Sequence, residues 1–143
     1  MINLKINNVP VSVEPGTTIL QAAKSIGIKI PTLCYLKDIN EIGACRVCVV
    51  EVKGARNLVA SCVYPVNEGM EVFTNSERVL KARKTTIELL LSNHRKECLS
   101  CERNTNCELQ TLAYEYCCDA NKYAGAMCTE PQDSSTEYLI RDN

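Results

Sequence analysis

The stretch "GACRVCVVEV", Gly43–Val52, joins two closely spaced cysteines to a short apolar run. Cys45 and Cys48 are separated by two residues, a spacing at which both thiols face one site when the backbone between them turns. Gly43 permits the close backbone approach that such a loop requires. The run "VVEV" that follows is typical of a short strand. The stretch therefore predicts a cysteine site in a loop that leads into a short strand.

Two alternating segments precede it at the start of the chain. Ile2–Ile6 and Val9–Val13 each alternate apolar with polar residues, as half-buried strands do. The Asn7-Asn8 pair between them tolerates the left-handed backbone of a tight hairpin turn. We expect an opening β-hairpin.

A helix is expected next, followed by further strands. Thr18 and Gln21 have the spacing of a capping box, and "TTILQAAKSIG" has helical character up to Gly27, a candidate C-cap. Beyond Val52, the runs "LVASCV" and "MEVFT" predict two more short strands. These patterns predict a small mixed sheet packed on one helix.

The second part of the chain has helical periodicity. Thr74 and Glu77 form a second possible capping box ahead of "SERVLKARKTTIELLLSNH". Ile87 and Leu91 share a face with His94, so we expect the imidazole to point inward. "CELQTLAYEYC" predicts a further helix. From Asp119 onward no period is visible, and we expect an irregular tail.

Composition narrows the classes of function. The net charge of -1 does not suggest a nucleic-acid partner, and no run of residues is apolar enough for a membrane span. Because no secretory signal pattern opens the chain, we expect a cytoplasmic protein. Ten cysteines in 143 residues are unusual there, since cytosolic thiols stay reduced, and they indicate metal ligation or redox chemistry.

A first set of four cysteines follows the pattern C-x10-C-x2-C-x13-C. Its members are Cys34, Cys45, Cys48 and Cys62, the last within an expected strand. Four thiolates can hold an iron-sulfur cluster or a zinc ion. Zinc ribbons place two C-x2-C pairs about 15–20 residues apart, and the next such pair here begins only at Cys98. A zinc site and buried structural cysteines remain the alternatives.

A second set has three thiolates and needs a fourth ligand to hold a cubane cluster. The thiolates are those of Cys98, Cys101 and Cys107. The candidates for the fourth position are His94, Cys117, Cys118 and Cys128. His94 and Cys98 are four residues apart, so one helical turn can bring their side chains together. Cys117 is well explained as a small hydrophobe on a helix stripe.

The motifs resemble one family. With the strand-strand-helix opening, "PTLC", "GACRVCVVEV" and "ASC" resemble the 2Fe-2S domain that begins iron-only hydrogenase catalytic subunits and the large iron-sulfur subunit of complex I. "H-x3-C-x2-C-x5-C" followed by "ELQ" resembles the 4Fe-4S motif that comes next in that family. The resemblance implies an α+β chain: a β-grasp 2Fe-2S ferredoxin domain over residues 1–75, a helical 4Fe-4S domain over 76–118, and a tail over 119–143 leading toward a missing or partner-supplied domain.

The resemblance also implies ligands. The 2Fe-2S cluster would take Cys34, Cys45, Cys48 and Cys62, and the 4Fe-4S cluster His94, Cys98, Cys101 and Cys107. No role is implied for Cys117, Cys118 or Cys128.

No P-loop, dinucleotide fingerprint or Ser-His-Asp set is present, so we expect the chain to carry electrons without a substrate site. The resemblance implies an electron-transfer module of an NAD(P)-linked iron-only hydrogenase complex, a class that includes electron-bifurcating complexes. It would serve a flavin-containing NAD(P)H-oxidising subunit, a thioredoxin-like 2Fe-2S subunit, and a catalytic or further cluster-bearing unit. The alternatives are the equivalent module of an NAD-dependent formate dehydrogenase or complex I, a zinc-binding interaction module, and a thiol-redox enzyme.

Overall fold

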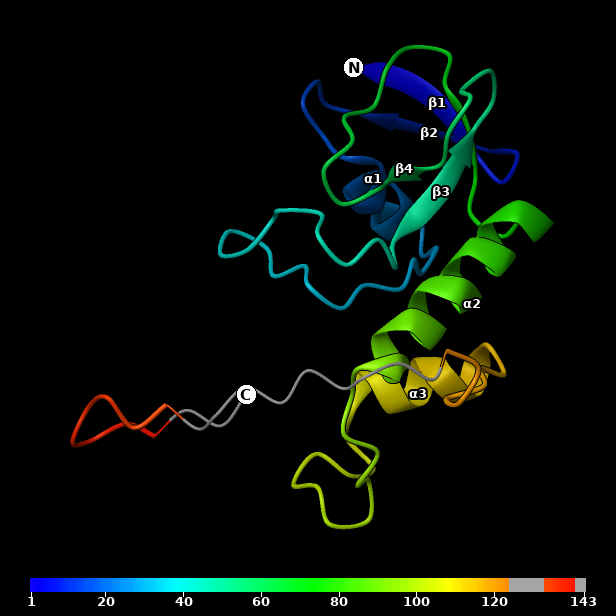
Figure 1. Ribbon diagram of the computed structural model, residues 1–143. Helices are drawn as coiled ribbons and strands as arrows, with labels where there is room; N and C mark the ends of the chain where they lie inside the picture. The colour runs from blue at the N-terminus through cyan, green and yellow to red at the C-terminus, as the bar shows by residue number, and fades with distance from the viewer. Residues whose placement is uncertain (124–132, 141–143) are drawn as a thin grey trace.

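A small sheet with one helix is joined through a long helix to a second helix. The computed structural model describes residues 1–123 and 133–140. In Figure 1 the sheet and α1 lie at one end, α2 runs away from them, and α3 lies at the far end of α2. The elements are β1 (Ile2–Ile6), β2 (Val9–Val13), α1 (Ile19–Ser25), β3 (Val49–Val52), β4 (Val59–Ala60), β5 (Glu71–Phe73), α2 (Glu77–Ser92) and α3 (Glu108–Glu115).

The sheet is mixed, as the sequence predicts. Its strand order is β2-β1-β5-β3-β4, with β1 and β5 parallel and the other neighbours antiparallel. The opening hairpin is confirmed: its register runs from Ile2 opposite Val13 to Ile6 opposite Val9. Asn7 and Asn8 have φ angles of 49° and 66°, the left-handed pair that a two-residue hairpin loop needs.

The first helix is capped as predicted. The Gln21 amide donates to Thr18 Oγ1 at 3.3 Å, and the Thr18 amide donates to Gln21 Oε1 at 3.2 Å. This reciprocal pair satisfies two amides that no helical carbonyl can reach. Gly27 follows the C-cap residue Ile26 with φ 74°, a left-handed conformation that costs glycine little.

The second predicted capping box is wrong. Ser76 is the N-cap of α2, and its hydroxyl accepts from the Val79 amide. Thr74 instead belongs to the sheet end: its amide donates to Asn7 Oδ1 at 2.8 Å, and Asn7 Nδ2 donates to its hydroxyl at 2.7 Å. The long-range pairing with the hairpin turn therefore prevails over the local motif.

Two apolar cores hold the molecule together. The first lies between the sheet and α1, and contains Ile6 and Ile19 together with Cys48 and Cys62. Ile6 and Ile19 are fully buried, which stabilises the fold by about 1.5–3 kcal/mol for each such side chain. Cys48 and Cys62 are thereby packed into the core between the sheet and α1.

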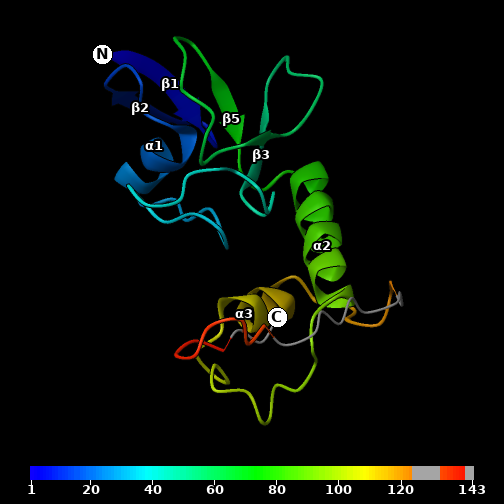
Figure 2. The ribbon, with the colours of Figure 1, turned by 60° about the vertical axis from the view of Figure 1, so that its left-hand side comes forward.

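The second core joins the cysteine loop to the two later helices. Its buried members are Val47 from the loop before β3, Ile87 and Leu91 from α2, and Leu112 from α3. Figure 2 shows the loop before β3 lying between the sheet and α3, and the loop and α3 are on the same side of α2. Because Val47 lies between Cys45 and Cys48, this core connects the first cysteine set directly to the helical unit.

Other expectations are confirmed or corrected. Helices form near both predicted positions, although α2 ends at Ser92 and α3 spans only Glu108–Glu115. Cys62 lies in the turn after β4, not within a strand.

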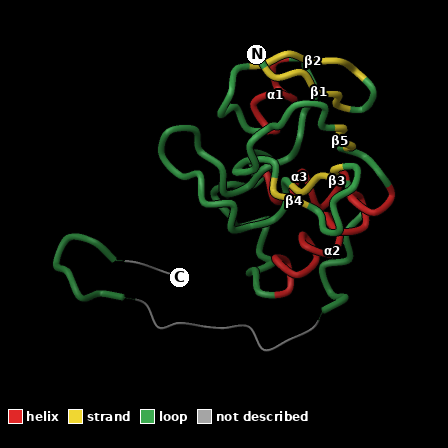
Figure 3. The backbone as a smooth tube through the Cα atoms, turned by 90° about the horizontal axis from the view of Figure 1, so that it is seen from above, coloured by secondary structure: helices red, strands yellow, loops and turns green. Residues whose placement is uncertain are grey.

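The expected irregular tail is described over residues 119–123 and 133–140, where no helix or multi-residue strand forms. Residues 133–140 are exposed throughout and project from the rest of the chain (Figure 3). Within the described residues, no helix is both long and apolar enough to cross a membrane.

Candidate metal centres

The first candidate centre is built by the aperiodic segment between α1 and β3. This loop is stabilised by its own backbone: the amide of Leu36 donates to the Asn40 carbonyl at 3.0 Å, and the reverse bond is 2.8 Å. Asn40 Nδ2 also donates to the Cys34 carbonyl at 2.8 Å. This segment shows no helical or strand periodicity of apolar residues, because turn hydrogen bonds, and not one buried apolar face, set its backbone conformation.

Two left-handed residues shape the loop around the C-x2-C pair. Gly43 has φ 64°, and a Cβ placed on it would lie 3.0 Å from Val63 Cγ2. Arg46, between the two cysteines, has φ 59°, which is uncommon outside glycine. The predicted need for glycine at position 43 thus has two causes, the backbone conformation and the proximity of Val63.

The first four predicted ligands come together in two pairs. The Cys45 amide donates to Cys34 Sγ at 3.5 Å, and the Cys48 thiol donates to Cys62 Sγ at 3.3 Å. Cys48 and Cys62 are 1% exposed, whereas Cys34 and Cys45 are half-buried. The site therefore has one buried and one more open side.

Ser61 fixes the buried pair. Its hydroxyl donates to the Cys48 carbonyl at 2.8 Å, and its amide donates to the same carbonyl at 3.2 Å. Ser61 is itself fully buried and directly precedes Cys62. The two bonds hold the backbone of one ligand candidate against that of the other.

The protonation behaviour of these thiols differs. Burial, the hydrogen bond with Cys48, and the nearby charges of Cys48, Cys34 and Cys45 raise the pKa of Cys62 to about 12. Burial also acts to raise the pKa of Cys45, but hydrogen bonds involving the Val47 backbone and Cys34 outweigh it and lower that pKa. The thiols therefore influence one another's protonation, and two of them, Cys48 and Cys62, are buried. Thiols must lose protons to bind metal, so cluster binding there would release them.

In the second candidate centre, His94 is placed differently from our expectation. Because α2 ends at Ser92, with Asn93 as its C-cap, His94 lies beyond the helix and is exposed rather than directed into a core. It does line a small cavity together with Cys98 and Cys118. The single helical turn expected to join His94 and Cys98 is not formed, and the two residues share only the lining of this cavity with Cys118.

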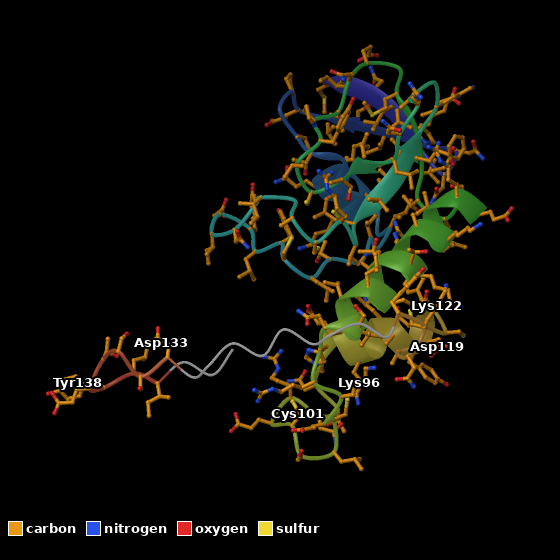
Figure 4. The ribbon with its side chains drawn as sticks, viewed as in Figure 1. Lys96, Cys101, Asp119, Lys122, Asp133 and Tyr138 are labelled. Carbon is orange, nitrogen blue, oxygen red and sulfur yellow. The ribbon has the colours of Figure 1, made fainter. Side chains whose placement is uncertain are left out.

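The three remaining predicted ligands lie along one exposed loop and the helix that follows. The Cys101 amide donates to the Cys98 carbonyl at 3.3 Å, so these two residues share a turn. Cys107 is the N-cap of α3 and lines a separate groove with Pro31 and Thr32 of the first loop. Figure 4 shows Cys101 on the segment between α2 and α3, which extends away from both helices.

The two sets fit clusters in different degrees. The first set has one thiol–thiol contact, Cys48 with Cys62, and a second pair joined through the Cys45 amide and the Cys34 thiol; thiolates are the ligands that 2Fe-2S clusters take. The second set has the donor chemistry of a 4Fe-4S site, three thiols and an imidazole, on one short loop. Among the described residues, no three histidine, cysteine or acidic side chains converge as closely as a single metal ion requires.

Two buried charged residues were missed by sequence reasoning. Arg83 and Glu88 of α2 are each 1% exposed. Glu88 accepts from Lys122 Nζ at 2.7 Å and from the Asp119 amide at 3.3 Å, which ties the segment after α3 to α2 (Figure 4). Arg83 could have been noticed, because it lies in helical phase with the buried residues Val79 and Ile87.

Family models cover both centres. Residues 1–77 match the model of the 2Fe-2S iron-sulfur cluster binding domain. The chain belongs to this family. Residues 83–122 of the chain match a second family model, described as the NADH-ubiquinone oxidoreductase-G iron-sulfur binding region, which is a 4Fe-4S model. The chain therefore has one 2Fe-2S and one 4Fe-4S domain, with one cluster of each type.

Relatives of this 2Fe-2S family member are subunits of larger oxidoreductases. It is 47% identical to the NADP-reducing hydrogenase subunit HndD of Solidesulfovibrio fructosivorans, over 99% of this chain and 25% of that protein. It is 41% identical to the NADH-ubiquinone oxidoreductase 75 kDa subunit of Reclinomonas americana, over 86% of this chain and 18% of that protein. The chain thus spans a quarter or less of these relatives.

A solved structure is also similar over nearly the whole chain. It is the crystal structure of an NAD+-reducing NiFe-hydrogenase in the H2-reduced state. The TM-score is 0.86 at 32% identity, covering 99% of this chain and 59% of that one. The arrangement of both domains is therefore one that a solved hydrogenase chain also has.

Proposed function

We propose that this chain is an electron-transfer iron-sulfur module of an NAD(P)-linked hydrogenase complex. The observation that carries the proposal is the shared second core: Val47, between two first-set cysteines, packs with Leu91 and Leu112 of the helical unit. Electron transfer slows steeply with distance, so two redox sites in series need a fixed separation, and a packed core supplies it. When bound, each cluster would accept and release one electron at a time.

Each domain would hold its cluster through the predicted ligands. Cys34 and Cys45 would bind one iron of the 2Fe-2S cluster, and Cys48 and Cys62 the other, in keeping with the two pairs in the structure. The domain boundaries we propose are residues 1–75, 76–118 and the tail 119–143.

The 4Fe-4S cluster would take one histidine and three cysteines. The proposed ligands are His94, Cys98, Cys101 and Cys107. The cavity shared by His94 and Cys98 supports the imidazole, and Cys118 is engaged elsewhere because its thiol donates to the Lys84 carbonyl at 3.8 Å. A neutral imidazole leaves the site less negative than a fourth thiolate would, so the cluster would accept an electron more readily.

The hydrogenase assignment is supported by the extent of similarity. The match to the NADP-reducing hydrogenase subunit covers 99% of the chain, tail included, against 86% for the NADH-ubiquinone oxidoreductase subunit. The second candidate is the equivalent module of a complex I-like NADH dehydrogenase, favoured by the family model over residues 83–122. For the leading candidate, we propose a cytoplasmic complex with an iron-only catalytic unit, a flavin-containing NAD(P)H-oxidising subunit and a thioredoxin-like 2Fe-2S subunit.

The test begins with anaerobic purification of the chain. Iron and acid-labile sulfide analysis should give about six iron atoms per chain, and the dithionite-reduced protein should give two EPR signals. Zinc, or no acid-labile sulfide, would contradict the proposal. Purification of the native complex then separates the two candidates: NAD(P)H-dependent hydrogen metabolism supports the hydrogenase, and NADH:quinone reductase activity supports the complex I-like alternative.

A further inference from the structure

Arg83 is a buried cation for which the described residues provide no counter-charge. It lies in the middle of α2 and is 1% exposed. Its Nη2 donates to the Val49 carbonyl at 2.8 Å and its Nη1 to the Tyr116 hydroxyl at 3.1 Å, while Nε has no hydrogen-bond partner. No carboxylate in the described part of the chain pairs with it.

Such a side chain requires an explanation. Arginine is almost never fully buried unless it is paired, because removal of a charge from water is costly. Two neutral acceptors satisfy part of the guanidinium's hydrogen bonding and none of its charge. The nearest acid on the same helix, Glu88, is occupied by Lys122 and the Asp119 amide.

The position of Arg83 indicates where the missing negative charge lies. Its acceptor carbonyl belongs to Val49, the residue directly after Cys48. One helical turn further along α2, Ile87 packs with Val47, the residue directly before Cys48. The helix therefore lies against both neighbours of Cys48, with its cation on the side of the first cysteine set.

We propose that Arg83 is an electrostatic positioning residue for the 2Fe-2S cluster, whose buried charge compensates the thiolate-rich site and makes the cluster easier to reduce. The inference rests on the proposed ligation by Cys34, Cys45, Cys48 and Cys62. A four-thiolate cluster is negatively charged, and reduction adds one further negative charge. A fixed cation stabilises the reduced form more than the oxidised form, so its removal lowers the potential.

The expected size follows from Coulomb's law. At an effective dielectric constant of about 20, a unit charge about 12 Å away contributes roughly 2.3 times RT, which is a factor of about ten. Loss of the charge should lower the ratio of reduced to oxidised cluster about tenfold at a fixed ambient potential, which is about 59 mV for a one-electron couple. Because buried charges are screened little, the shift should persist at high salt.

The experiment compares matched variants of the full chain, purified anaerobically with both clusters. EPR-monitored redox titration of the 2Fe-2S signal should show the tenfold loss in R83M, with R83K, which retains the charge, close to wild type. R78M is the control: Arg78 is on the same helix but its side chain is 48% exposed, and it is bonded to the Arg56 carbonyl and Glu51. Loss of that solvent-screened charge should leave the potential unchanged.

Clear outcomes overturn the proposal. A wild-type potential in R83M, or an R83K potential displaced as far as that of R83M, would mean that Arg83 only ties α2 to β3 and α3. If R83M does not retain its cluster, the potentials of R83K and Y116F test the proposal instead. Both variants alter the hydrogen bonds of the Arg83 guanidinium and keep a positive charge at position 83. They should have lower thermal stability and a wild-type potential, and a tenfold loss in either refutes the inference. Absence of a 2Fe-2S signal in the wild-type chain would instead refute the proposed function.

Discussion

Cys48 Sγ lies 3.3 Å from Cys62 Sγ, although the two residues are fourteen positions apart in the sequence. The pair is buried in the first core, and Ser61 bonds the backbone of one cysteine to that of the other. If the two thiols bind iron as proposed, they would form a preorganised half of the site, since the packed core already orders both side chains.

Substitution of Cys62 is expected to abolish one cluster and leave the other. C62S should lose the 2Fe-2S EPR signal and two of about six iron atoms, because the buried pair loses a thiolate. The matched control is C117S, since Cys117 is exposed and lies outside both proposed sets. A full 2Fe-2S signal in C62S would mean that another cysteine is the ligand.

Gly43 allows a test of the loop itself. G43A should destabilise the protein by about 1–3 kcal/mol, because it places a side chain at positive φ and against Val63. G54A is the control, since Gly54 also has positive φ, 84°, but a Cβ there would meet no atom within 4 Å. The double variant G43A/V63A should recover part of the difference in the free energy of unfolding. Equal losses in G43A and G54A would show that Val63 plays no part.

The fourth ligand of the 4Fe-4S cluster can be identified with two variants. H94C should keep the cluster at a lower potential, because a thiolate makes the site more negative than an imidazole does. C118A should keep the cluster and its potential, although Cys118 lines the same cavity. Loss of the 4Fe-4S EPR signal in C118A, with H94C unchanged from wild type, would identify Cys118 as the ligand.

The contact between Glu88 and Lys122 predicts a pH dependence. The Lys122 hydrogen bond lowers the pKa of Glu88, against the opposing effect of burial and with help from the Asp119 amide. A carboxyl group whose pKa is lower in the folded state stabilises the fold above its unfolded pKa of about 4.3, and that contribution is lost as pH falls through the folded value. E88Q should therefore lower the Tm at neutral pH.

The measurement compares thermal unfolding of wild type and E88Q, both freed of clusters to avoid acid lability. The difference in Tm should be constant between about pH 6 and 8 and should narrow below about pH 4. K84M is a control, since it removes a nearby lysine charge that is not hydrogen-bonded to Glu88. A pH-independent difference would show that the Glu88 charge contributes nothing.

Much of the fold was predictable because its determinants are local. The alternation around Asn7-Asn8 predicted the hairpin, and Thr18 and Gln21 predicted the start of α1. The mixed sheet and the order of its elements follow the sequence patterns, and the family models confirm one 2Fe-2S and one 4Fe-4S domain. The individual ligands remain predictions.

The failures share a physical cause. Thr74 has the spacing of a cap, yet Asn7, 67 positions away in the sequence, takes its hydrogen bonds. His94 is in phase with Ile87 and Leu91, yet the helix ends two residues earlier. Helical phase and capping patterns describe a local preference, and packing against distant segments decides whether it is realised.

By itself, the sequence determined which donor groups are available at cluster spacings, thiols and one imidazole, and it predicted most of the strands and helices around them. Only the tertiary structure decided that Cys48 meets Cys62, that Val47 joins the two centres, and that Arg83 is buried beside the first of them. The reason is that local hydrogen bonding selects backbone conformation residue by residue. Burial and the dielectric around a charge, in contrast, exist only after distant segments have packed together.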